Sequence, residues 1–146
     1  EHRPHPTDAG HLLVLCEGVV DVDLEAATWD WHVPPERFPD GADMDYLQPQ
    51  DFVVSKDGLH TVVAIYTADF SEVELWEVDK DGPATLLAGG LQSAERSLEV
   101  HEGELFFGDR DVQRSGLRRF SWEGGALDEA QSTGLPPYSV GTWRVP

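Results

Sequence analysis

Residues 52–87 read FVVSKDGLHTVVAIYTADFSEVELWEVDKDGPATLL, and this stretch decides the fold class. Its apolar positions fall in short segments rich in β-branched and aromatic residues, which is the composition of strands rather than helices. The pairs Asp57-Gly58 and Asp81-Gly82 separate these segments and are strong hairpin signals, because glycine tolerates a positive φ. The stretch therefore predicts antiparallel strands joined by short turns: Phe52–Ser55, Thr61–Tyr66, Val73–Val78 and Ala84–Leu87.

A similar pattern recurs on both sides of this stretch. Trp31, Trp76 and Phe120 each lie near the end of a strand-like segment, at intervals of 45 and 44 residues. An apolar segment precedes each aromatic residue at a comparable distance: Val19-Val20, Val62-Val63 and Leu105-Phe106. Such a spacing indicates an internal repeat. We expect about three repeats, over residues 11–50, 51–95 and 96–137.

Units of four antiparallel strands are the blades of β-propellers. Segments Phe52–Gly58 and Val73–Val78 resemble the inner-strand turn and the third strand of a WD40-like blade, although the Gly-His and Trp-Asp pairs of that family are missing. Residues 106–109, Phe-Phe-Gly-Asp, stand in the place of Tyr-Trp-Thr-Asp in YWTD-type and NHL-type blades. The resemblance covers about residues 51–132 and implies β-propeller-type blades. It implies no particular activity, because propellers host binders, scaffolds and enzymes alike.

The remaining segments are assigned by their relation to the repeats. Residues 1–10 lack periodicity and predict a flexible arm, whereas residues 11–146 predict a single all-β domain. Residues 138–146 predict a closing strand that pairs with His11–Cys16. Propellers need about four to eight blades and this chain offers about three, so we expect a second chain or copy to complete the ring. The alternative fold is a β-trefoil, which three such repeats complete alone.

Charge restricts the partners of this chain. Asp and Glu number 28 against 10 Lys and Arg, a net charge of −18, which argues against nucleic acid because phosphate contacts need positive charge. No apolar run of the sequence reaches the roughly 20 residues that span a bilayer. We expect a soluble protein that binds a protein or a small molecule, including basic partner surfaces, and the compartment stays open. Cys16, the only cysteine, is expected to pack as a small apolar residue.

Acidic clusters raise the question of a bound metal ion. Asp40, Asp43 and Asp45 lie in a long loop rich in Pro and acids, and Asp79 with Asp81 brackets a turn. Carboxylate oxygens suit Ca²⁺, but the spacing of an EF-hand is not found in the segment that begins at Asp79. The sequence therefore predicts no cofactor, and the alternative is a Ca²⁺ site built from several loops.

The candidate ligand-binding residues are His32, Asp69, Asp109 and Arg110. His32 opens the long loop, and Arg110 lies between two acids, where its planar guanidinium suits a ligand carboxylate. For Asp109 the resemblance to YWTD-type blades implies a second role, in which this acid is tied into the turns between blades. The motifs of nucleophilic catalysis and of phosphate loops are missing from the sequence. No catalytic residue is predicted, and whether the chain is an enzyme stays open.

Together these features favour a binding or scaffolding module that presents loops on one rim of a β-propeller. One alternative is a propeller-type hydrolase or lyase that uses loop carboxylates and His32. Another is a β-trefoil carbohydrate-binding module, in which some of the five Trp residues stack on sugars.

Overall fold

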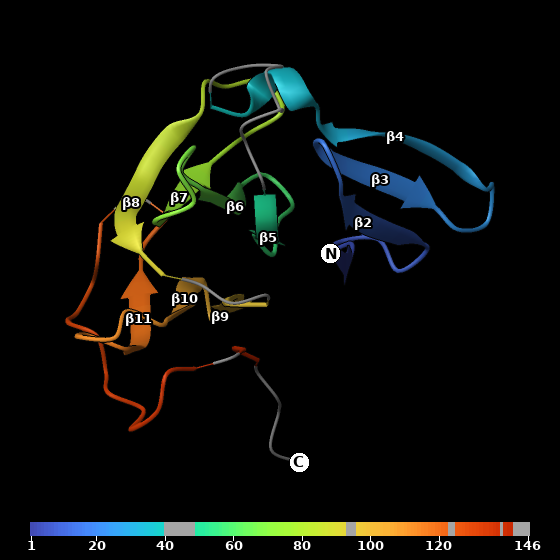
Figure 1. Ribbon diagram of the computed structural model, residues 1–146. Helices are drawn as coiled ribbons and strands as arrows, with labels where there is room; N and C mark the ends of the chain where they lie inside the picture. Colours follow the sequence, from blue (N-terminus) through green and yellow to red (C-terminus); the bar gives the residue numbers. More distant parts are fainter. Residues whose placement is uncertain (40–48, 93–95, 123–124, 138, 142–146) are drawn as a thin grey trace, which may run out of the picture.

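The computed structural model describes residues 1–39, 49–92, 96–122, 125–137 and 139–141. Strands form three antiparallel sheets in this part of the chain, and the only helical element assigned there is the 3₁₀ turn η1, Pro35–Arg37. The predicted all-β class is confirmed. Figure 1 shows the sheets as three sectors, with β4, β8 and β11 on their outer sides. Among the described residues, no helix is long and apolar enough to cross a membrane.

The first sheet begins earlier in the chain than the sequence predicts. Its strands follow one another in the order β1 (His2–Pro4), β2 (His11–Leu15), β3 (Val19–Asp23) and β4 (Thr28–Val33). Residues 1–10 are therefore not wholly the expected loose arm, because Arg3 pairs with Leu13 along the edge of β2. Since β1 and β3 take the two edges of β2, the expected pairing of residues 138–146 with His11–Cys16 is not available. Most of residues 138–146 lie outside the described residues.

The second sheet confirms the four-stranded meander predicted from residues 52–87. It consists of β5 (Pro49–Val54), β6 (Thr61–Tyr66), β7 (Val73–Glu77) and β8 (Thr85–Leu91), each hydrogen-bonded to the next. Gly58 has φ 78° in the turn between β5 and β6, as the Asp-Gly signal requires.

The third sheet contains β9 (Leu98–His101), β10 (Glu104–Asp109) and β11 (Gly116–Phe120). Glu102 and Gly103 connect β9 to β10 with positive φ angles of 51° and 83°, the backbone of a tight two-residue hairpin. Beyond β11 the chain returns along this strand, because Leu117 forms an isolated antiparallel bridge with Gln131.

The middle sheet is buried on both faces, which explains why β6 is apolar at nearly every position. Val63 and Ile65 belong to the core shared with the first sheet, together with Leu13. Val62 and Ala64 point to the other face and belong to the core shared with the third sheet. Alternation of side chains along a strand therefore sends neighbouring residues of β6 into two different cores.

The three sheets are separate within the described residues, and no closed sheet is formed there. This arrangement does not support the β-trefoil alternative, because a trefoil requires strands of different repeats to pair in a common barrel. Strand β5 instead contacts β2 and β9 without pairing with either.

The aromatic residues of the predicted repeat are equivalent only in part. Each pairs across a hairpin with an apolar residue of the preceding strand: Val20 with Trp31, Val63 with Trp76, and Leu105 with Phe120. However, Trp31 lies in the fourth strand of its sheet, whereas Trp76 and Phe120 lie in third strands. The extra strand β1 at the edge of the first sheet causes this offset. Cys16 was expected to pack as a small apolar residue, and this prediction is wrong, because Cys16 is exposed in the turn after β2.

Candidate functional site

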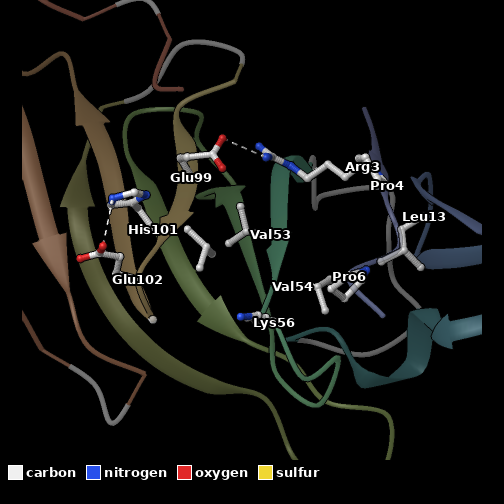
Figure 2. A pocket seen from close by; sticks show the side chains of 12 residues that line it. Arg3, Pro4, Pro6, Leu13, Val53, Val54, Lys56, Glu99, His101 and Glu102 are labelled. Atoms are coloured by element: carbon white, nitrogen blue, oxygen red, sulfur yellow. Dashed lines mark hydrogen bonds and ion pairs between the residues drawn. The ribbon is translucent and has the colours of Figure 1, made fainter. Parts of the chain in front are cut away.

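A cavity of about 820 Å³ lies where the three sheets meet. Figure 2 shows that its walls come from all three sheets, with Leu13 on one side, Val53 and Val54 in the middle, and Glu99 and His101 opposite. Each sheet contributes its first strand, namely β1, β5 and β9. The cavity is therefore a product of the tertiary arrangement and belongs to no single repeat.

Arg3 joins the three sheets at one end of this cavity. Its Nη2 donates to Asp51 Oδ1 at 2.9 Å and to the Leu98 carbonyl at 2.7 Å, and Nη1 lies 3.4 Å from Glu99 Oε2. The guanidinium carbon also stands 6.0 Å from the centroid of the Phe52 ring, a distance at which cation and ring attract. A single side chain of β1 thus contacts β5 and β9 at once.

Asp51 completes this junction from the buried side. Its side chain is fully buried, and Oδ2 accepts from the Leu98 amide at 2.8 Å while Oδ1 accepts from its neighbour Phe52. A buried carboxylate requires such donors, because an unpaired charge away from water is costly. Asp51 and Arg3 therefore hold the first strands of the three sheets in place around the cavity.

The opposite end of the cavity is open and carries charged side chains. Lys56 comes from the β5–β6 turn, and His101 and Glu102 come from the β9–β10 hairpin. The Glu102 side chain is 86% exposed, and its carboxylate lies 4.0 Å from His101 Nε2. Apolar walls with charges at the mouth can take a ligand that has an apolar body and a charged end.

Asp109 is enclosed by hydrogen-bond donors of the chain and does not face solvent. It is fully buried, and Oδ1 accepts from the amides of Gln92 and Asp111, both at 3.0 Å. Arg118 donates from Nε to the other carboxylate oxygen. These contacts tie the end of β8 to the end of β10. Arg110 follows directly, and its amide donates to the Gln92 carbonyl at 2.6 Å.

Asp69 lies in the exposed turn between β6 and β7. Its Oδ1 accepts hydrogen bonds from the Ser71 hydroxyl at 2.7 Å, the Thr67 hydroxyl at 2.8 Å and the Ser71 amide. These donors stabilise the charged form and lower the pKa of Asp69 to about 2. The carboxylate thus organises its own turn.

His32 lies at the opposite end of the strands from Asp69 and Asp109. Its Nε2 stands 3.2 Å from the hydroxyl of Thr61, the first residue of β6, whereas Asp69 follows the end of that strand. Burial lowers the pKa of His32, with a further contribution from the nearby His5. The ring centroids of His5 and His32 are 5.9 Å apart. The predicted ligand-binding residues are therefore not brought together in one site.

Sequence reasoning missed the residues that line the cavity. Arg3 falls in the segment expected to be a loose arm, and Asp51 is one acid among many. A usable signal was the alternation in β9, where Glu99 and His101 share one face of a short strand. The expected loop acids Asp40, Asp43 and Asp45 lie outside the described residues.

Comparison of the chain with protein-family models, curated proteins and solved structures found no match.

Proposed function

We propose that this chain is a binding module built from β-propeller-type sheets, and that its central cavity receives a basic segment of a protein partner. The observation that carries the proposal is the cavity itself, which the first strands of three sheets line together. First strands gathered around a common space are the arrangement of propeller blades around their channel.

A basic segment fits the chemistry of the cavity. Lys and Arg side chains combine an apolar stem with a cationic head, so the stem suits walls such as Val53 and Val54. The head suits Glu102, whose carboxylate is exposed at the mouth. The net charge of −18 adds a long-range attraction for basic partners that speeds their encounter.

An uncovered apolar surface supports completion of the fold by a second chain or copy. The outward face of the first sheet carries neighbouring rows of apolar residues that belong to neither core: Leu12, Val14, Val20, Val22, Trp29 and Trp31. Trp29 is 63% exposed and meets Trp31 edge to face at 5.5 Å. Apolar patches of this kind on a soluble protein mark interaction surfaces.

The hydrolase or lyase alternative has less support. The sequence links this alternative to His32 and loop carboxylates, but His32 Nε2 lies 3.2 Å from the Thr61 hydroxyl, at the opposite end of β6 from Asp69.

Binding can be tested by fluorescence anisotropy with a labelled peptide in which two Arg alternate with Leu, and with the same peptide carrying citrulline in place of Arg. We expect the Arg peptide to bind and Glu102→Lys to weaken it about tenfold through repulsion at the mouth. Glu25→Lys is the matched control, because it changes the net charge equally at an exposed position of the β3–β4 turn. Equal weakening by both variants indicates attraction by net charge alone and contradicts a site in the cavity.

A second measurement addresses completion of the fold. Sedimentation equilibrium at high salt, which screens repulsion between acidic copies, should give a mass above 16.2 kDa if a second copy completes it. Trp29→Ser should lower that mass, whereas Val112→Ser, at an exposed position away from the first sheet, should not.

A further inference from the structure

The β6–β7 hairpin brings three metal-ligating side chains together outside the cavity. Val62 pairs with Glu77, and the Val78 amide donates to the Thr61 carbonyl at 2.8 Å, so the same register places His60 opposite Asp79. Glu77 and Asp79 are two residues apart and therefore point to the same side of the strand, whereas Val78 between them is buried. The hairpin register thus fixes which three side chains meet.

The distances between the donor atoms are close to those of a metal site. His60 Nδ1 lies 2.8 Å from Glu77 Oε1 and 3.8 Å from Asp79 Oδ2, and the three donor atoms lie within 4.8 Å of one another. Bonds of about 2.0–2.2 Å to a tetrahedral ion place its ligand atoms about 3.3 Å apart. The other oxygen of Asp79 accepts from the Thr61 amide at 3.3 Å, which orients the carboxylate. Small side-chain movements are enough to close the three atoms around an ion.

Space for further ligands of the ion lies beside His60. A second cavity, of about 560 Å³, is lined by His60 together with Ser55, Asp57 and Trp122. The Trp122 ring stands 5.9 Å from the His60 ring and forms one wall. Because all three donor residues are partly exposed, water or another small molecule can reach an ion held there.

We propose that His60, Glu77 and Asp79 bind one divalent transition-metal ion of the Zn²⁺ class, with at least one coordination position left to solvent. One imidazole and two carboxylates suit Zn²⁺ and neighbouring first-row ions. They suit Ca²⁺ poorly, because Ca²⁺ takes six to eight oxygen ligands. The site differs from the Ca²⁺ alternative that the sequence leaves open, which is built from several loops.

The experiment is isothermal titration of the full chain with ZnCl₂, repeated with CaCl₂. We expect one Zn²⁺ per chain, and His60→Ala and Glu77→Gln should each weaken binding at least about tenfold. His101→Ala is the matched control, because this exposed histidine has one carboxylate at 4.0 Å, Glu102. Far-UV circular dichroism of each variant shows whether it folds. If His60→Ala does not fold, Glu77→Gln still tests the site, because glutamine keeps the shape of the glutamate side chain.

Location of the ion can be read directly from histidine ¹⁵N shifts on addition of Zn²⁺. The ring nitrogen of His60 should shift, and those of His5 and His11, whose rings lie 5.9 Å apart in the first sheet region, should not. The proposal is overturned if the chain does not bind Zn²⁺ or if His101→Ala loses as much Zn²⁺ affinity as His60→Ala. It is also overturned if only the ring nitrogens of His5 and His11 shift. Equal affinity for Ca²⁺ also overturns it.

Discussion

Replacement of Arg3 by Met tests whether one side chain holds the three sheets together. Methionine keeps an unbranched apolar stem and removes the guanidinium that contacts Asp51, the Leu98 carbonyl and Glu99. Asp51 then keeps its hydrogen bonds from the amides of Phe52 and Leu98 but loses its cationic partner while fully buried.

The magnitude follows from the burial of the two partners. Removing one member of a buried ion pair costs about 3–5 kcal/mol, because the remaining charge is uncompensated. Arg3 itself is 20% exposed, so water already screens part of the pair and the lower end of this range applies. We therefore expect Arg3→Met to lower the free energy of unfolding by about 3 kcal/mol.

Urea denaturation followed by circular dichroism measures this change, because the midpoint moves while the slope stays constant if only stability has altered. Arg114→Met is the matched control, since Arg114 is exposed and lies 3.4 Å from Asp111 in a surface pair, a kind of pair that contributes little. Equal midpoints for the two variants would show that β1 is not anchored by Arg3, and residues 1–10 would then behave as the loose arm that the sequence predicts.

Three further predictions concern the core and the pH dependence. Phe107→Ala should cost about 3–5 kcal/mol in urea denaturation, because the ring is fully buried in the core between the second and third sheets. Gly116→Ala should cost about 1–3 kcal/mol in the same assay, because a Cβ there would lie 2.3 Å from the Gln131 carbonyl oxygen. Burial lowers the pKa of His32, so the unfolded chain binds the proton first and stability should fall as the pH drops below about 6.5. In His32→Gln, thermal melts between pH 7 and pH 5 should show a smaller decrease, and an unchanged decrease would contradict this reasoning.

Local patterns were enough to predict the second sheet. Alternation and composition marked β6 and β7, and Asp57-Gly58 marked the turn before β6. These signals are carried by residues adjacent in sequence, so no knowledge of the tertiary fold is needed to interpret them. The continuous apolar character of β6 is explained by its burial on both faces, since Val62 and Val63 enter different cores.

Strand β1 could not be predicted in this way. Its three residues, His2–Pro4, have no alternating pattern, and Pro lacks the amide that a strand interior needs. The strand exists because β2 offers a free edge and because Asp51, 48 residues away, pairs with Arg3. Contacts of that sequence separation leave no periodic signal. The additional strand β1 is also the reason why Trp31 lies in the fourth strand of its sheet rather than the third.

The candidate sites illustrate the same limit from the side of chemistry. Asp69 and Asp109 are predicted ligand-binding residues, but both carboxylates accept hydrogen bonds from within the chain. His60, Glu77 and Asp79 were not connected, although the predicted hairpin already implied their juxtaposition. Extending the antiparallel register beyond the predicted strand ends would have placed His60 opposite Asp79.

Buried acids explain why composition says so little about function in this chain. Of the 28 acids in the sequence, Asp51 and Asp109 are the ones buried among the described residues, and each has an arginine partner, Arg3 and Arg118. Both pairs lie where one sheet meets the next, so these two carboxylates stabilise the arrangement of the sheets. The composition alone does not distinguish them from the many other acids. Neutralising an exposed acid that accepts no hydrogen bond among the described residues should therefore relieve repulsion between like charges, whereas neutralising either buried acid removes an acceptor for two backbone amides. Residues with the same charge thus affect stability in opposite directions, according to the hydrogen bonds that each carboxylate accepts.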